Sequence, residues 1–204
     1  MTQNQQQRSR LVLYILAAVF IAPILFAYVV YKNRALIPSD TKSFGEIVSP
    51  ASPLPEFKLR KINDEAFSLD DMRHKWSYLY FIKSTCDEAC QLNLIKMRNA
   101  RLAQGSDADR VRYYLVFTGE PSKQVVSDEF IKQHPRITVL YGNGPDMQSL
   151  ISVFQKNQEK PVGESRRVYM VDPIGNYMMF YEDGFEAVGI MEDLKHLLKW
   201  SQIG

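Results

Sequence analysis

Two cysteines, Cys86 and Cys90, are the residues of this chain whose type and spacing are best suited to chemistry. They are the only cysteines among its 204 residues, and they lie four positions apart where an apolar stretch gives way to a polar one. A thiol pair at the turn between a strand and a helix indicates redox or metal chemistry more than a structural cross-link. We therefore expect the function to depend on this turn.

The spacing of the two thiols allows a reversible disulfide. Residues i and i+4 on one helix face lie about 6 Å apart, within the Cα separations that a disulfide permits. A cross-link over so short a loop adds little chain-entropy stabilisation, so we expect it to be easily reduced. Cys86 is the candidate nucleophile and Cys90 the resolving partner, although the carboxylates of Asp87 and Glu88 oppose thiolate formation. Two thiolates could also hold Cu(I), and the alternative without chemistry is a pair of packing residues or an inert disulfide.

The elements around the cysteines follow from the pattern on either side. Residues 78–82, Tyr-Leu-Tyr-Phe-Ile, are continuously apolar or aromatic, which predicts a central strand buried on both faces. Thr85 and Glu88 have the spacing of a capping box, so a helix is predicted to begin there and to end near Gly105. Cys86 would then lie in the first helical turn, where free amide donors and the helix dipole favour a thiolate.

The remaining pattern alternates strands and helices. Further strands are predicted at residues 111–118, 137–141, 168–171 and 177–180, the last two joined by a turn at residues 172–176. Helices are predicted at residues 123–133, around residues 147–154 and around residues 191–198. This order predicts an α/β fold with a thioredoxin-like mixed sheet covered by helices.

Four segments are expected along the chain. Residues 1–10 form a short cytoplasmic leader, and residues 11–31 carry no charge over about 31 Å of helix, enough for a single transmembrane anchor. A cleavable signal peptide is the alternative, but its apolar core is normally shorter and no small-x-small cleavage site follows this run cleanly. Residues 32–55 are rich in proline and serine and are predicted to be a tether. Residues 56–204 form the thioredoxin-like domain. It opens with a hairpin of residues 56–59 and 66–69, followed by a short helical turn capped by Asp70 or Asp71.

Composition excludes several classes of function. The net charge is +2 and the isoelectric point is about 8.4, with the basic residues scattered, so a nucleic-acid partner is not expected. A glycine-rich phosphate loop is absent from the sequence, which excludes nucleotide binding of that kind. The three histidines, His74, His134 and His196, are expected to be solvated or capping side chains, because none has the spacing of a metal ligand.

Taken together, these residues resemble the Sco (SenC-type) family of copper-dependent cytochrome c oxidase assembly proteins. The likeness covers residues 54–200 and includes the cysteine pair, Lys75-Trp76-Ser77-Tyr78-Leu79-Tyr80-Phe81 and Val168-Tyr169-Met170-Val171-Asp172-Pro173-Ile174-Gly175. It implies a thioredoxin-like fold, a single-pass protein of the bacterial inner membrane, and a domain on the periplasmic side. It also implies copper bound by Cys86, Cys90 and a histidine before the penultimate strand.

Two positions depart from that family pattern. Asp87 follows the first cysteine where the family has proline, and Glu164 occupies the place of the ligand histidine. The copper site is therefore incomplete, since a carboxylate is a hard ligand poorly matched to Cu(I). Glu164 is expected to be an exposed loop residue.

Three functions remain open on this reading. The first is a thiol-disulfide oxidoreductase that assists copper-site assembly in cytochrome c oxidase, acting on an oxidase subunit or a copper chaperone. The second is a Cu(I) metallochaperone. The third is a non-catalytic oxidase assembly factor with a degenerate copper site.

Overall fold

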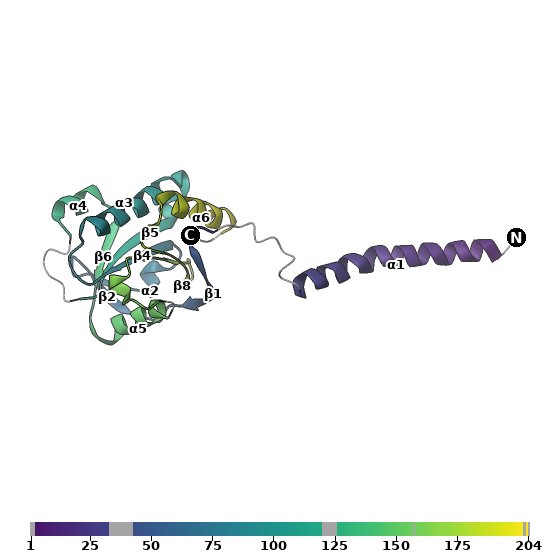
Figure 1. Ribbon diagram of the computed structural model, residues 1–204, viewed down its shortest axis with the longest axis horizontal. Helices are drawn as coiled ribbons and strands as arrows, with labels where there is room; N and C mark the ends of the chain where they lie inside the picture. The colour runs from purple at the N-terminus through teal and green to yellow at the C-terminus, as the bar shows by residue number, and fades with distance from the viewer. Residues whose placement is uncertain (1–2, 33–42, 120–125, 157, 202, 204) are drawn as a thin grey trace. The chain divides into compact units, whose positions relative to one another are not determined.

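The computed structural model describes residues 3–32, 43–119, 126–156, 158–201 and 203 (Figure 1). The chain divides after Lys42 into two compact units. The first contains helix α1 (Gln3–Lys32), and the second contains all the strands described below.

Helix α1 is a candidate single-pass membrane anchor. Within the described residues it is the one helix long and apolar enough to span a bilayer, with a mean hydropathy of 2.6 over Val12–Val30. Pro23 lies inside the span, which membrane helices tolerate. The predicted span of residues 11–31 matches this stretch to within one residue at each end.

The second unit is built on one mixed sheet of eight strands in the order β1-β8-β7-β4-β5-β6-β2-β3. Strands β4 to β6 run parallel to one another, and the other neighbouring pairs are antiparallel. The strands are β1 (Glu46–Pro53), β2 (Lys58–Lys61), β3 (Ala66–Ser68), β4 (Trp76–Ile82), β5 (Val111–Phe117), β6 (Ile137–Tyr141), β7 (Val168–Val171) and β8 (Asn176–Tyr181).

Strand β4 lies inside the sheet, as its unbroken apolar run predicts. All seven of its residues are buried, and it pairs with β5 on one side and β7 on the other. Tyr78 and Tyr80 face one hydrophobic core, whereas Leu79 and Phe81 face the other. The loop that carries Cys86 therefore follows directly from a strand that is fixed on both sides.

Helices cover both faces of the sheet (Figure 1). The core on one face is closed by α3 (Glu88–Leu102), α4 (Asp128–Gln133) and α6 (Ala187–Trp200). The core on the other face is closed by α5 (Gly144–Gln155) and the short α2 (Leu69–Met72). Two 3-10 helices, η2 (Gly105–Arg110) and η3 (Val162–Glu164), complete the unit. The predicted α/β class and mixed sheet are confirmed.

Most predicted elements agree with the structure, with shifts at their ends. The hairpin, the later strands and the turn at residues 172–176 are confirmed, with Asp172 accepting hydrogen bonds from the amides of Ile174 and Asn176. The short helix α2 is capped by Ser68, and Asp71 accepts from the Ser68 amide. The helix predicted at residues 123–133 begins only at Asp128, after the N-cap Ser127, and its residues 123–125 lie outside the described residues.

The tether prediction for residues 32–55 is wrong over its second half. The compact unit begins at Ser43, and β1 pairs antiparallel with β8 at the edge of the sheet, with a register shift between Ile47 and Ser52. An edge strand needs hydrogen bonds on one side only, so it accommodates the prolines that suggested irregular structure. Residues 33–42 of the predicted tether lie outside the described residues.

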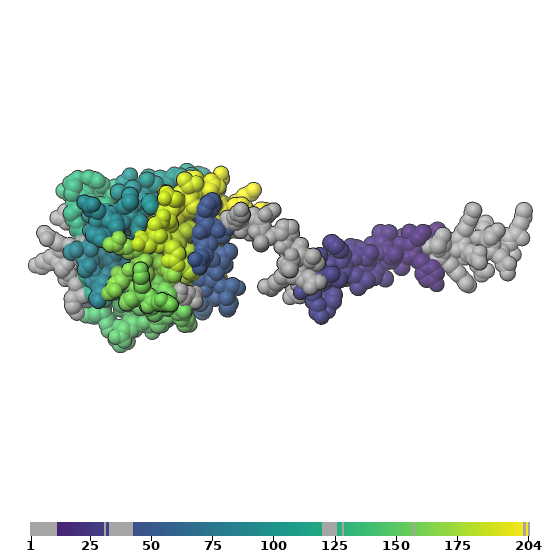
Figure 2. Space-filling model, viewed as in Figure 1, coloured from purple at the N-terminus to yellow at the C-terminus, as the bar shows by residue number. Residues whose placement is uncertain are grey.

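Helix α6 holds the start of this unit in place. The carboxylate of Asp193, which is 7% exposed, accepts hydrogen bonds from the amides of Phe44 (3.1 Å) and Gly45 (2.9 Å) and from the Tyr181 hydroxyl (3.1 Å). Figure 2 shows the blue start of the unit lying against the yellow C-terminal helix. The amides of Phe44 and Gly45, which precede β1, are therefore satisfied by a buried carboxylate and not by a helix or a neighbouring strand.

Buried tyrosines make the domain sensitive to alkali. Burial raises the pKa of Tyr114 to about 12, and it also raises the pKa of Tyr78, whose environment includes the negative charge of Asp193. A tyrosine with a raised folded-state pKa adds stability that is complete below its unfolded pKa and is lost as pH rises through the folded value. We expect the free energy of unfolding to be constant from pH 7 to pH 9 and to fall by roughly 2–3 kcal/mol between about pH 10 and 12 through the ionisation of Tyr114, with Tyr78 adding to the loss in the same direction.

Urea titrations of the full chain in a non-ionic detergent at pH 8 and pH 11 would measure this loss. The variant Tyr114→Phe removes one ionisable group and should lose less stability over the same range. Equal unfolding midpoints at the two pH values would contradict the prediction.

Candidate functional site

The structure joins Cys86 and Cys90 in a disulfide, with their Cα atoms 5.2 Å apart. Both residues belong to the core on the α3 face, and Cys86 is 8% exposed while Cys90 is 3% exposed. The pair therefore lies at the edge of the core, immediately beyond the end of β4. Cys90, the candidate resolving partner, is the more shielded of the two.

The predicted start of the helix, with Thr85 as its N-cap, is wrong by two residues. Helix α3 begins at Glu88, and its N-cap is Asp87, whose side-chain oxygen accepts from the Cys90 amide at 2.9 Å. Aspartate is a stronger N-cap than threonine, which explains why the expected box of Thr85 and Glu88 does not form. Cys86 consequently precedes the helix, and at least one first-turn amide is directed to Asp87.

A pocket of about 290 Å³ lies beside the disulfide. One wall is the end of β4 and the loop after it, and the opposite wall is η3 together with the residues that join it to β7. Of the two cysteines, Cys90 lines it. The lining residues are Tyr80, Phe81, Ile82, Lys83, Ser84, Thr85, Asp87, Cys90, Gly163, Glu164 and Arg166.

Two ion pairs cross this pocket from wall to wall. The Arg166 guanidinium lies 2.7 Å from Asp87, and the Lys83 ammonium lies 3.1 Å from Glu164. All four side chains are well exposed, so the pairs add little to stability. Their charges cancel, and the pocket beside the disulfide is polar but electrically balanced.

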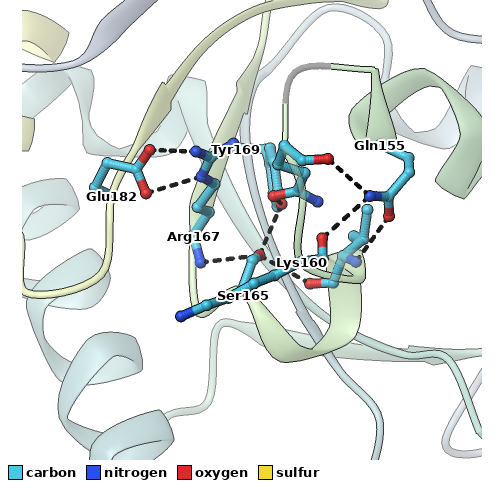
Figure 3. Close-up of polar contacts among 8 residues, drawn as sticks. Gln155, Lys160, Ser165, Arg167, Tyr169 and Glu182 are labelled. Atoms are coloured by element: carbon cyan, nitrogen blue, oxygen red, sulfur yellow. Dashed lines mark hydrogen bonds and ion pairs between the residues drawn. The ribbon is translucent and has the colours of Figure 1, made fainter.

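The wall that carries Glu164 and Arg166 is held by a polar network beneath it (Figure 3). The Ser165 hydroxyl donates to the carbonyl of Val162 and lies 3.0 Å from the Tyr169 hydroxyl. Gln155 accepts from the Val162 amide and donates to the Lys160 carbonyl. The segment is therefore fixed by α5 and β7 rather than by its exposed charges.

Gly163 sets how closely this wall approaches β4. A Cβ atom at this position would lie 2.8 Å from the Thr118 hydroxyl and 3.3 Å from the Lys83 amide nitrogen. Since both distances are shorter than ordinary contact, any larger residue would push the wall away from the strand. Glycine here keeps the pocket narrow.

The residues present do not fit the copper site that the resemblance implies. Glu164, at the position expected for the histidine, is paired with Lys83. In the part of the chain that the structure describes, histidine, cysteine and acidic side chains nowhere gather in a group of three able to hold a metal. Both carboxylates that line the pocket, Asp87 and Glu164, are already engaged by a basic side chain.

The histidines lie elsewhere, as expected. His74 and His196 are exposed. His134 is buried at the end of α4, where its ring stacks on Phe130 and its Nδ1 lies 2.8 Å from the Phe130 carbonyl oxygen. Met170 and Met179 are core residues.

Sequence reasoning missed the two cations of the site, Lys83 and Arg166. Lys83 directly follows β4, and that position was the one available signal, because residues just beyond a central strand line its carboxyl end. Arg166 gave no signal, because its place beside Asp87 depends on contact between segments 79 positions apart.

Comparison with known proteins assigns the family and the fold. The chain belongs to the family described as transmembrane-like, thioredoxin-like, C-terminal domain, whose model matches residues 76–201. Its curated relatives are Sco proteins, among them the SCO2-like protein of Rickettsia felis, 23% identical over 152 residues that cover 69% of this chain and 74% of the relative. The chain spans about half the length of two mitochondrial relatives, from Arabidopsis thaliana (52%) and Saccharomyces cerevisiae (55%).

Solved structures of Sco proteins share the fold. Copper-bound ScoI of Arabidopsis thaliana superposes with a TM-score of 0.59 at 19% identity, covering 74% of this chain and all of that one. BsSco, described as having a disulfide switch and as a member of the Sco family of cytochrome c oxidase assembly proteins, has a TM-score of 0.55 at 16% identity, covering 76% and 99%. The thioredoxin-like architecture and the resemblance to Sco proteins are therefore confirmed.

Proposed function

We propose that this chain is a membrane-anchored thiol-disulfide oxidoreductase that assists assembly of the copper site of cytochrome c oxidase. The observation that carries the proposal is the closed Cys86–Cys90 disulfide beside a pocket that reaches Cys90. Helix α1 anchors the chain in the bacterial inner membrane, with the domain on the periplasmic side. The relatives described as oxidase assembly proteins support the choice of process.

The reaction is an exchange of one disulfide for another. In the reduced chain the Cys86 thiolate attacks a disulfide of the partner, forming a mixed disulfide and releasing one partner thiolate. The Cys90 thiolate then attacks the Cys86 sulfur, which closes the Cys86–Cys90 bond and releases the second partner thiolate. The partner gains two electrons and its thiolates take protons from water, while the chain loses two electrons. A dithiol donor on the same side of the membrane restores the reduced chain by the reverse steps.

The partner in this scheme is an oxidase subunit or a copper chaperone whose copper-binding cysteines must be reduced before metal can enter. The metallochaperone alternative is weaker, because Glu164 is engaged by Lys83 and leaves the dithiol without a third soft ligand. A non-catalytic docking role gives no reason for a cysteine pair to lie beside a pocket.

A trapping experiment tests the proposal directly. The Cys90→Ser chain, full length and reduced, is mixed with a purified copper-site domain of an oxidase subunit in its disulfide form. We expect a covalent adduct through Cys86 that reductant releases, because the resolving thiol is missing. Non-reducing electrophoresis and mass spectrometry would measure the adduct.

The double variant Cys86→Ser with Cys90→Ser is the matched control and should form none. Absence of an adduct with the single variant would sink the oxidoreductase proposal. A Cu(I) titration of the reduced wild-type chain against a competing chelator would then decide for the metallochaperone if it showed tight one-to-one binding.

A further inference from the structure

Asp87 places a negative charge next to the reacting sulfurs. It directly follows Cys86, and one of its carboxylate oxygens accepts from the amide of Cys90. The nucleophile in thiol-disulfide exchange is a thiolate, so an uncompensated carboxylate at this position would slow the approach of anionic thiolates. The site therefore needs a nearby cation.

Arg166 supplies that cation from a different segment of the chain. Its guanidinium donates to the second carboxylate oxygen of Asp87 at 2.7 Å, so both oxygens of Asp87 are engaged. The other two charges that line the pocket, Lys83 and Glu164, already form a pair with each other. Removing Arg166 would leave the pocket with a net charge of −1.

The backbone at Arg166 is held in an unfavourable conformation. Its φ is +56°, in the left-handed region that residues other than glycine, asparagine and aspartate rarely adopt. The buried Ser165 and the network of Figure 3 impose this turn just before the residue. Strain of this kind persists where the surrounding structure dictates it, and it clusters at functional sites.

We propose that Arg166 is a positioning residue that acts through Asp87 to keep the disulfide accessible to anionic thiolates. The inference rests on the proposed function and adds the class of substrate. Because Arg166 neutralises the Asp87 carboxylate, negatively charged thiolates can approach the disulfide as well as positively charged ones. A partner segment with acidic residues beside its cysteines is then a permitted substrate.

The test compares rates of reduction of the oxidised full-length chain by three small thiols. These are anionic mercaptoethanesulfonate, neutral mercaptoethanol and cationic cysteamine, at low ionic strength in a non-ionic detergent. The variant Arg166→Asn removes the charge while asparagine tolerates the left-handed backbone. We expect the ratio of the reduction rate with mercaptoethanesulfonate to that with cysteamine to be about three- to fivefold lower in this variant than in the wild type. This difference should become smaller at high salt.

Three further variants make the result specific. Arg166→Lys should restore most of the wild-type ratio. Adding Asp87→Asn to Arg166→Asn should restore it as well, since asparagine still caps α3 and the pocket is left with no net charge. Arg60→Asn removes an exposed arginine from β2 and should leave the ratio unchanged.

An equal slowing of all three thiols in Arg166→Asn, or no recovery in the double variant, would overturn the inference. The outcome is independent of the oxidase partner. If the copper-site domain fails to form an adduct while the charge ratio changes as expected, the proposed function fails and the role of Arg166 in disulfide reactivity stands.

Discussion

Replacing Cys86 by serine is expected to lower the rate of disulfide exchange by about three orders of magnitude or more, because the nucleophilic sulfur itself is removed. The fold should survive. A cross-link over so few residues contributes about 2 kcal/mol by chain entropy, which is a modest part of the stability of a domain. Exchange with the disulfide form of the oxidase copper-site domain, followed by alkylation and mass spectrometry, would measure the rate.

Cys90→Ser is the informative comparison for this variant. It breaks the same disulfide and should lose a similar amount of stability, yet it keeps the first step and stalls at the mixed disulfide. Two variants that lose activity equally at that first step would show that Cys86 is not the attacking residue.

Replacing Asp193 by alanine is expected to destabilise the domain by about 3 kcal/mol, since it leaves the amides of Phe44 and Gly45 and the hydroxyl of Tyr181 without their acceptor. The residues at the start of the domain should be the ones that loosen first. Urea titrations followed by tryptophan fluorescence would measure the free energy of unfolding, and limited proteolysis would report cleavage between Ser43 and Glu46.

Asp193→Asn keeps the shape and one acceptor oxygen, so it should lose clearly less than the alanine variant. Asp183→Ala removes an exposed carboxylate from the same domain and serves as the control, with an expected change within about 0.5 kcal/mol. A loss no larger in Asp193→Ala than in this control would contradict the role of the buried carboxylate.

The sequence predicts the interior of this fold better than its edges. The run at residues 78–82 could only be a central strand, because a fully apolar stretch of that length must be buried on both faces. Residues 46–53 were expected to be irregular because of their prolines. Their pairing with β8 depends on a free sheet edge, which local sequence does not reveal.

The cysteine pair of the candidate site could be located from the sequence, whereas the side chains around it could not. The cysteine pair is evident from residue type and spacing. Thr85 and Asp87 are both acceptable N-cap residues, and the helix begins after Asp87. Cys86 therefore lies before the first helical turn. Arg166 and its left-handed backbone arise from a network centred on Ser165, which only the folded chain brings together.

The pocket is assembled from two stretches that share no covalent continuity near the site, one after β4 and one before β7. Each is supported by its own neighbours, so mutation can alter either without rebuilding the other. The sulfur pair and the charges that face it can therefore change independently of each other. Grafting residues 161–167 between relatives, with Gly163 kept, is the corresponding route for protein engineering.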